Sequence, residues 1–421
     1  MRVLIVNALY TPYKIGGAEK SVQLLAEGLA RRGEAVTVVT LHEDAAPEEA
    51  DLNGVHLIRL PLDNRYWPYG APDADHGTGE RLLWHLRNSW NRAAAARFGR
   101  VLDAVRPDVV HCNVITGFSV AIWREVRRRQ IPLVQTLRDY GLICCRSSLF
   151  KAGRNCQTRC GECRVLTHPA RGASRRVDQL VSNSNHVIAA HQALGYFAGV
   201  PARRIFNVVD LAEAPRQPAS PSGAPLVFGF IGRIEAEKGI EVVLAAFARL
   251  ARADWRLRIA GVGRPEYVAG LRAAYPDPRI VWLDFVTAGD FYRSIDVVLI
   301  ASIWAEPLPR TLIEALGAGV AAICSDAGGI PEIADLGLHT ITYPAEDPVA
   351  LAEAMSRALA EADAWRKGGL KDPAALALFS EAAIVDAYRA VYADARASAG
   401  RVHRVPLNRP SGQTISEQSA D

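Results

Sequence analysis

Short apolar runs alternate with amphipathic segments along the first half of the chain. Residues 2–6 contain the continuous apolar run 3–6, as expected for a strand covered on both faces of a parallel sheet. The segment after Gly17 gathers its apolar positions on one side of a helix, which Gly33 ends. The same reasoning predicts further strands at residues 35–40, 55–60, 109–113, 133–137 and 180–182. This alternation is typical of a Rossmann-like domain.

A second series of strands and helices follows a proline-rich stretch. Residues 211–225 contain four prolines, a composition typical of an extended linker. Helical patterns at residues 239–250 and 311–316 separate the apolar runs that come after it. These strand-like runs lie at residues 226–231, 257–260, 280–283, 297–301, 320–325 and 340–342.

We therefore expect an α/β fold in which two Rossmann-like domains face a central cleft. Open parallel sheets bind ligands at the carboxyl ends of their strands, so the cleft is the expected site. Ser380 can cap the last helix, which can cross back to the first domain. The expected parts are a first domain over 1–210, a linker over 211–225, a second domain over 226–375, that helix over 376–396, and a disordered tail over 397–421.

Composition excludes several classes of protein. The 421 residues are 49% hydrophobic and 22% charged, which excludes a wholly disordered or fibrous chain. A formal net charge of +4 is too small to indicate a nucleic-acid partner. The apolar run after Met1 is too short for a signal peptide, and no run is apolar enough to span a membrane. Seven cysteines without an export signal indicate a reducing cytoplasm.

Residues 81–130 concentrate positive charge and tryptophan. They contain ten arginines against three acidic residues, together with Trp84, Trp90 and Trp123. Such a segment suits peripheral contact with anionic lipid headgroups, which would place the chain at the inner face of the plasma membrane. A solvated helix face explains the same composition.

The most informative segment joins Glu306 and Glu314. Pro307 and Pro309 exclude a helix interior, so a helix begins near Pro309 or Arg310 and exposes unpaired N–H groups. A carboxylate on each side of such an anion site suits a nucleotide sugar. The alternative is a first-turn glutamate favoured by the helix dipole beside a second, solvated one.

Two basic residues and a glycine pair accompany these carboxylates. Arg233 and Lys238 are expected in a strand-to-helix loop, where they can neutralise a diphosphate. The alternative is a loop with solvent-exposed basic side chains. The glycines of the segment 328–332 allow the backbone to approach a ligand, or serve only a turn.

Taken in order, these motifs resemble the retaining glycosyltransferases of the GT-B fold, glycosyltransferase family 4. The resemblance covers nearly the whole chain except the tail and is densest from Gly229 to Glu332. The matching motifs are Gly16-Gly17-Ala-Glu-Lys20, Gly232-Arg233 with Lys238-Gly239, the segment Glu306-Pro-Leu-Pro-Arg-Thr-Leu-Ile-Glu-Ala315, and Gly328-Gly329-Ile-Pro-Glu332.

The resemblance implies a role for each motif. Glu306 would hold donor-sugar hydroxyls, while Arg233 and Lys238 would hold the diphosphate of a UDP or GDP sugar. The first domain would then take the acceptor and the second the donor. The reaction would retain the anomeric configuration and need neither cofactor nor metal, since the acceptor attacks on the leaving-group face and the phosphate takes its proton. The donor-binding residues it implies are Gly16, Gly17, Phe285, Leu308, Pro309, Arg310 and Glu314.

Two positions depart from the family pattern. Relatives carry two histidines where this chain has His111 and Asn113, and Asn can hydrogen-bond a sugar but cannot shuttle a proton. The expected catalytic residues are therefore Glu306, Arg233, Lys238 and Asn113. Arg138 replaces a histidine and either binds an anionic group or pairs with Asp139. His111 and Arg138 are the acceptor-side candidates.

Two segments have residue types and spacings found in metal sites. Cys144-Cys145 followed by Cys156-x3-Cys160-x2-Cys163 fits a structural zinc site, reduced thiols or an adventitious disulfide, without a catalytic role. Asp73-Ala-Asp75 resembles a metal-binding D-x-D motif, but its place in a loop favours a solvated turn.

The sequence thus predicts a cytoplasmic glycosyltransferase that acts on a glycan or lipid-linked acceptor in cell-envelope or exopolysaccharide synthesis. The departures at Asn113 and Arg138 favour a second reading, a non-catalytic module that only binds nucleotide sugars. A third reading of the sequence is a GT-B sugar epimerase.

Overall fold

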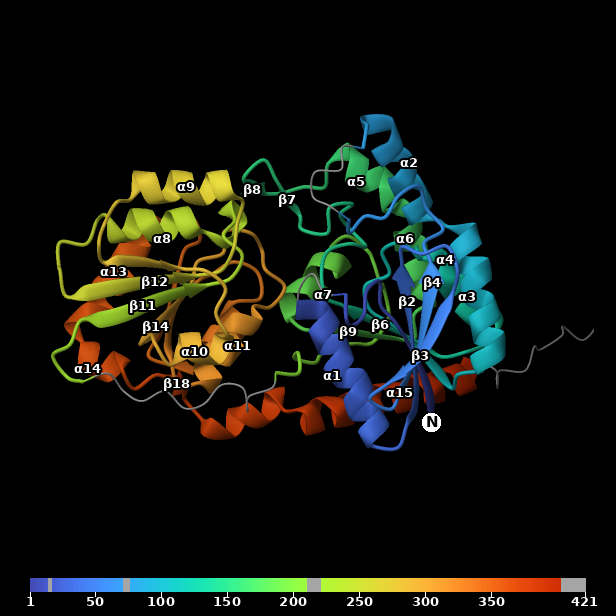
Figure 1. Cartoon of the computed structure of the whole chain (residues 1–421). Coiled ribbons are helices and arrows are strands. Elements are labelled where there is room, and N and C mark those ends of the chain that lie inside the picture. The colour runs from blue at the N-terminus through green and yellow to red at the C-terminus, as the bar shows by residue number, and fades with distance from the viewer. Residues whose placement is uncertain (14–16, 71–75, 210–220, 403–421) are drawn as a thin grey trace, which may run out of the picture.

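Two mainly parallel β-sheets, one in each half of the chain, organise the structure (Figure 1). The computed structural model describes residues 1–13, 17–70, 76–209 and 221–402. The expected α/β fold with two Rossmann-like domains is confirmed.

The first sheet has β1 near its centre, where both faces are covered. Leu4 and Ile5 of β1 are fully buried, as the continuous apolar run predicts. All neighbours pair in parallel except β3, which runs antiparallel to β4. In spatial order the strands are β10 (Ala202–Arg204), β9 (Gln179–Ser182), β6 (Leu133–Leu137), β5 (Val109–Cys112), β1 (Arg2–Val6), β2 (Ala35–His42), β4 (Val55–Pro61) and β3 (Glu48–Leu52).

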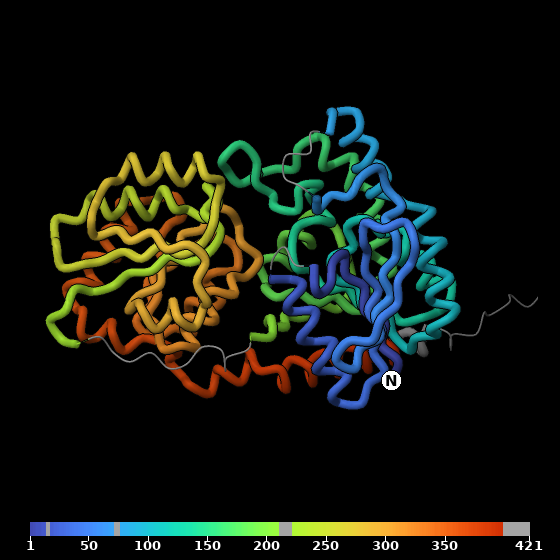
Figure 2. Tube along the Cα trace, viewed as in Figure 1, coloured from blue at the N-terminus to red at the C-terminus, as the bar shows by residue number. Residues whose placement is uncertain are grey.

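Helices cover both faces of this sheet. Phe98 and Trp123 belong to the core on one face, and Val22 and Leu25 to the core on the other. A short hairpin of β7 (Phe150–Lys151) and β8 (Arg154–Asn155) projects toward the second domain (Figure 2). The helices are α1 (Gly17–Arg31), α2 (Thr78–Ser89), α3 (Arg92–Val105), α4 (Ala121–Arg128), α5 (Gly161–Leu166), α6 (His168–Ala173) and α7 (Asn185–Gln192).

The second domain repeats the architecture with a fully parallel sheet. In spatial order its strands are β13 (Ile280–Leu283), β12 (Trp255–Ala260), β11 (Leu226–Ile231), β14 (Val297–Ile300), β15 (Ala321–Ser325) and β17 (Thr340–Tyr343). Its other elements are α8 (Ile240–Phe247), α9 (Pro265–Ala274), α10 (Ala288–Tyr292), α11 (Arg310–Gly317), α12 (Pro331–Ala334), α13 (Pro348–Ala360), α14 (Ala362–Trp365), and the antiparallel pair β16 (Gly337–Leu338) and β18 (Gly369–Leu370).

The last helix, α15 (Glu381–Val402), runs from the second domain along the first (Figure 1). Ser380 caps it by accepting a hydrogen bond from the N–H of Ala383. Tyr388 and Tyr392, four residues apart, are buried in the core beneath the first sheet. The helix continues to Val402, so the segment 397–402 of the expected tail is helical.

Every strand predicted from the sequence is present, with ends that differ by at most two residues. The prediction missed β3, β10, the β7–β8 hairpin and the β16–β18 pair. Strands β3 and β10 lie at the edges of the sheet and consist largely of exposed polar residues, so they lack the apolar run that marks a central strand.

Candidate active site

Glu306 and Lys238 meet at the carboxyl end of the second sheet. Glu306 follows β14, and its Oε1 lies 2.8 Å from the Nζ of Lys238 in the loop between β11 and α8. Ser302 donates to the other carboxylate oxygen at 2.6 Å, and the Lys238 ammonium lies 5.6 Å from the centre of the Trp304 ring. The structure therefore brings together the two residues expected to hold the sugar and the diphosphate.

Arg233 stands apart from this pair. Its guanidinium forms an ion pair with Glu235 at 2.8 Å, and its side chain is 57% exposed. Partial burial and a neighbouring Glu237 raise the pKa of Glu235, while Arg233 opposes that rise. Arg233 is thus available at the surface of the loop, with Glu235 as its partner.

Glu314 lies inside α11, as the proline pattern predicts, but in the second turn rather than the first. The helix begins at Arg310 after Pro309, which stands at its N-cap. Glu314 lies 3.2 Å from the hydroxyl of Tyr292 and 3.4 Å from the guanidinium of Arg310. Burial and the Glu314 carboxylate raise the pKa of Tyr292, so this hydroxyl stays protonated and donates.

Arg310 connects the two domains. It donates to Ser21 Oγ at 3.2 Å and to the carbonyl of Val208 at 3.0 Å, both in the first domain. A Cβ on Gly17 would lie 2.6 Å from Arg310 Cδ, so the missing side chain permits this approach. Gly16, expected beside Gly17, lies outside the described residues.

The remaining donor-side residues differ in exposure. Leu308 is packed in the core of the second domain, so its side chain is unavailable to a ligand. Pro309 is buried as well, whereas the Phe285 side chain is 82% exposed beyond β13. Donor contacts at Leu308 would have to come from the backbone.

The glycine pair at 328–329 packs against the Glu306 segment. The N–H of Gly329 donates to the Glu306 carbonyl at 2.8 Å, and Gly328 has a φ of +66°. The carboxylate of Glu332 accepts from the N–H groups of Asn185 and His186, at the start of α7 in the first domain. These residues therefore hold the Glu306 loop and the domain interface.

On the first-domain side, Asn113 and Arg138 are joined and His111 is separate. Arg138 donates to Asn113 Oδ1 at 2.8 Å and to Asn207 Oδ1 at 2.9 Å. His111 is fully buried, with its ring nitrogens 2.8 Å from Tyr392 OH and 2.7 Å from Thr136 Oγ1. The acceptor-side role expected of His111 is wrong, because the alternation of strand side chains turns its ring under α15.

Arg138 was expected either to bind an anionic group or to pair with Asp139, and the structure bears on the second alternative. Its partners are two neutral amides, and the carboxylate of Asp139 instead accepts from the N–H of Gly141 at 2.8 Å. The expected ion pair with Asp139 is therefore absent among the described interactions.

The sequence reasoning missed two residues that bind the Glu306 loop from the first domain. Tyr140 donates its hydroxyl to the carbonyl of Ala305 at 2.7 Å. Asn155, at the end of β8, donates to the Ile303 carbonyl at 2.7 Å and accepts from the Ala305 N–H at 2.9 Å. The segment that contains Tyr140 was noted in the sequence. No pattern in residues 150–155 predicts a hairpin that reaches the other domain.

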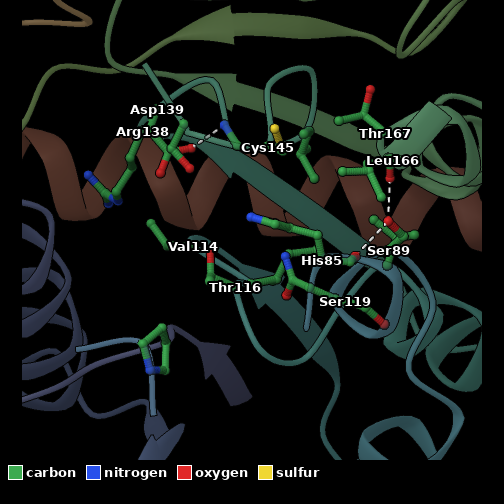
Figure 3. A pocket seen from close by; sticks show the side chains of 18 of the residues that line it. His85, Ser89, Val114, Thr116, Ser119, Arg138, Asp139, Cys145, Leu166 and Thr167 are labelled. Carbon is green, nitrogen blue, oxygen red and sulfur yellow. Dashed lines mark hydrogen bonds between the residues drawn. The ribbon is translucent and has the colours of Figure 1, made fainter. Parts of the chain in front are cut away.

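A cavity of about 290 Å³ opens in the first domain at the carboxyl ends of β5 and β6, and we term it the β5–β6 cavity (Figure 3). Asn113, Gln135, Arg138 and Asp139 contribute to its lining, and α2 forms another wall. In Figure 3 the charged residues Arg138 and Asp139 lie together, away from His85 of α2.

Asp139 makes stability depend on pH. Burial raises its pKa to about 6, only partly offset by the Gly141 N–H. The folded state therefore holds the proton more tightly than the unfolded chain, and this contribution to stability is present below about pH 4 and is lost as pH rises through about 6. Asp139→Asn cannot ionise and keeps the oxygen that Gly141 needs. We expect its melting temperature to exceed that of the wild type by a few degrees near pH 8 and to match it near pH 4. A constant offset in thermal melts across this range would contradict the burial argument.

The cysteines of residues 144–163 gather around Cys163. Its sulfur lies 3.6 Å from that of Cys145 and 3.9 Å from that of Cys144. All seven cysteines are free, and in the part of the chain that the structure describes no group of three or more His, Cys, Asp or Glu is arranged to hold a metal ion. The described chain thus shows a cluster of thiols here. Asp73 and Asp75 lie outside the described residues.

The Arg/Trp-rich segment is not a surface patch as a whole. Trp84 and Trp123 are 4% and 0% exposed, so they belong to the core and cannot contact headgroups, which corrects that expectation. Several of its arginines are paired, for example Arg97 with Asp63 and Arg127 with Asp178. None of the described helices combines the length and apolar character that crossing a bilayer requires.

The surface of α2 instead carries apolar residues. Leu82, Leu83 and Leu86 are each about half exposed, at 50%, 50% and 47%. This face was not predicted, because the leucines flank Trp84, which is buried on the other side of the helix.

Two family models match the chain. The model of the glycosyl transferases group 1 matches residues 225–361, and that of the glycosyl transferase 4-like domain matches residues 16–208. A relative described as an uncharacterized 42.6 kDa protein in the cps region of Klebsiella pneumoniae is 32% identical over 340 residues, 79% of this chain and 87% of that protein.

Solved structures share the fold. Sucrose-phosphate synthase from Thermosynechococcus elongatus superposes with a TM-score of 0.70 at 20% identity, covering 93% of this chain and 99% of that one. The Anabaena protein HepE, in complex with UDP and glucose, gives 0.64 at 17% identity with the same coverage. The chain therefore belongs to the group 1 glycosyltransferases, family 4, which have the GT-B fold and transfer a sugar from a nucleotide sugar.

Proposed function

We propose that the chain is a retaining, metal-independent hexosyltransferase that moves a sugar from a UDP or GDP sugar to a glycan or lipid-linked acceptor. The observation that carries the proposal is the ion pair of Glu306 and Lys238 beside the domain interface. Ala305, next to Glu306, is bound by Tyr140 and Asn155 of the first domain. A sugar held at Glu306 would therefore face residues of both domains.

The charges suit a diphosphate leaving group. The Lys238 ammonium is available to a donor phosphate and would offset the charge that grows as the glycosidic bond breaks. Glu306 is then released to accept hydrogen bonds from sugar hydroxyls, which strengthen as the ring flattens toward the transition state. Glu314 stands where it can accept from ribose hydroxyls, with Arg310 beside it.

A UDP sugar is the first donor to test, because the Anabaena structure holds UDP and glucose in the same fold. A GDP sugar is the second. The relative from a cps region supports a role in cell-envelope or exopolysaccharide synthesis. We place that role on the cytoplasmic side of the membrane.

The direct experiment measures the slow hydrolysis of UDP and GDP sugars without acceptor, with and without EDTA. We expect release of nucleoside diphosphate with one donor, unchanged by EDTA, and a product of the donor's anomeric configuration by NMR. Binding without turnover across an acceptor panel would favour a non-catalytic module. Conversion of the donor sugar without release of nucleotide would favour an epimerase. Either result would reject the proposal.

The leucine face of α2, Leu82, Leu83 and Leu86, would bring a lipid-linked acceptor within reach. We expect the triple change to Ser to weaken binding to vesicles with anionic lipid by roughly tenfold or more, because three half-exposed leucines lose apolar burial. Sedimentation with vesicles measures this. The matched control replaces Val349 and Leu378, which are similarly exposed on the second domain. Equal binding by both variants and the wild type would remove the membrane part of the proposal.

A further inference from the structure

We propose that Asn155, on the β7–β8 hairpin of the first domain, is a positioning residue for Glu306, and that Tyr140 supports it from the same domain. The inference rests on the proposed function, because it takes the donor sugar to be held by Glu306. It adds to that function a part for the other domain: hydrogen bonds from the first domain align a carboxylate that lies in the second. Neither the motifs nor the relatives assign such a role to residues 150–155.

The segment 303–305 leads from β14 to Glu306 and lies between the two domains. On the side of the second domain, the N–H groups of Ile303 and Trp304 donate to the carbonyl of Glu237, in the loop between β11 and α8, at 2.9 and 3.5 Å. On the side of the first domain, the Trp304 side chain packs against the core of that domain. A shift of the segment would therefore move the Glu306 carboxylate relative to the loop that carries its lysine partner.

Three backbone groups of this segment find their hydrogen-bond partners in the first domain. The side-chain amide of Asn155 donates to the carbonyl of Ile303 at 2.7 Å and accepts from the N–H of Ala305 at 2.9 Å. The hydroxyl of Tyr140 donates to the carbonyl of Ala305 at 2.7 Å. Among the described residues these three groups have no other hydrogen-bond partner, so the second domain does not hold them by itself.

The two hydrogen bonds of Asn155 fix the direction of the segment as well as its place. An asparagine side chain carries a donor and an acceptor in one plane, and here they bind on either side of Trp304. Glu306 follows Ala305 directly, so this alignment reaches the carboxylate through a single residue. Because a misplacement of about 1 Å can cost an enzyme about 10²-fold in rate, such support matters at the reacting sugar.

The hairpin that presents Asn155 is anchored on the first domain (Figure 2). Phe150 of β7 pairs with Asn155 of β8, and the N–H of Cys156 donates to the carbonyl of Leu149 at 2.7 Å. The Leu149 side chain packs against the core of the first domain. Strand pairing and an apolar anchor therefore hold the amide in place, as a positioning residue requires.

Tyr140 is a suitable second support because its hydroxyl remains a donor. Its side chain is fully buried. Burial, and to a smaller extent the charge of the Glu306 carboxylate, raise the pKa of Tyr140, so the hydroxyl keeps its proton. It can therefore donate to the carbonyl of Ala305 throughout the pH range in which the enzyme is assayed.

The test compares Asn155→Ala with Gln157→Ala in the full chain, by initial rates of donor hydrolysis without acceptor. We expect Asn155→Ala to lower kcat by about tenfold or more while the KM for the donor stays within about twofold, because Lys238 and Glu314 can still bind the donor. Gln157 is the matched control: it is exposed and carries the same amide two residues further along the same segment. Its variant should hydrolyse the donor at the wild-type rate.

A double-mutant cycle with Glu306→Gln separates positioning from a general loss of structure. If Asn155 acts through the Glu306 carboxylate, Asn155→Ala should lower kcat by no more than about twofold once that carboxylate is gone. Tyr140→Phe removes only the hydroxyl and should lower kcat several-fold, again without raising KM. Thermal melts of the single variants should stay within a few degrees of the wild type, since few hydrogen bonds are lost in each.

The positioning role is overturned if Asn155→Ala matches Gln157→Ala, if it raises KM and spares kcat, or if its effect on kcat is undiminished in the Glu306→Gln background. Should Asn155→Ala fail to fold, the same cycle with Tyr140→Phe decides by the same criteria. The proposed function fails separately. A wild-type rate for Glu306→Gln would reject the role of that carboxylate, and no hydrolysis of any donor would reject the proposed function and this inference with it.

Discussion

Glu306→Gln is expected to lower kcat by about 10²–10³-fold while changing the KM for the donor far less. The amide keeps the shape of the side chain and can still accept from Ser302, but it loses the charge that faces Lys238. If Glu306 accepts hydroxyl hydrogen bonds that strengthen in the transition state, the loss falls on turnover. Initial rates of transfer, or of donor hydrolysis where the acceptor is unknown, separate the two parameters.

The control for this prediction is Glu353→Gln, an exposed carboxylate on α13 of the same domain. It removes the same charge from an exposed side chain outside the proposed site, so its rates should equal those of the wild type. If Glu306→Gln raised KM and spared kcat, the carboxylate would act in ground-state binding, and the proposed role at the reacting sugar would fail.

The fold was largely predictable because its central strands carry continuous apolar runs. A run buried on both faces, such as residues 3–6 or 226–231, has no polar position that interrupts the pattern. The strands at the edges of the sheet were not predictable, because they lack such an apolar run. Strand β10 pairs on one side only and all three of its residues are exposed, so its sequence carries no packing signal.

The site was predictable where chain geometry alone sets a position. Two prolines fixed the start of α11, and with it the places of Glu306 before the helix and Glu314 inside it. The direction of each side chain was harder to predict, because a shift of one residue along a strand turns a side chain to the other face of the sheet. His111 and Asn113 lie two apart around the end of β5, yet only Asn113 lines the cavity, since the backbone leaves the strand after Cys112.

Contacts between distant segments could not be predicted at all. Asn155 stands 148 residues before Ile303 in sequence, and its amide nonetheless holds the backbone that precedes Glu306. No local pattern of hydrophobic and polar residues encodes such a contact, because it depends on how the two domains meet. The first domain therefore holds the segment that leads to Glu306 through hydrogen bonds to its main-chain atoms.

Gly239→Ala is expected to destabilise the fold by roughly 2–5 kcal/mol and to abolish most activity. Gly239 is the N-cap residue of α8 with a φ of +75°, and a Cβ there would overlap the carbonyl of Ala301, just after β14. To remove this overlap, either the loop that carries Lys238 or the segment that leads to Glu306 must move. Gly199→Ala is the matched control, since Gly199 has a φ of +76° with no atom within 4 Å of its Cβ position. It should cost only about 1 kcal/mol, the strain of the left-handed backbone alone. Denaturant unfolding and donor turnover measure both variants, and an equal loss in the two would show that the contact with Ala301 contributes nothing.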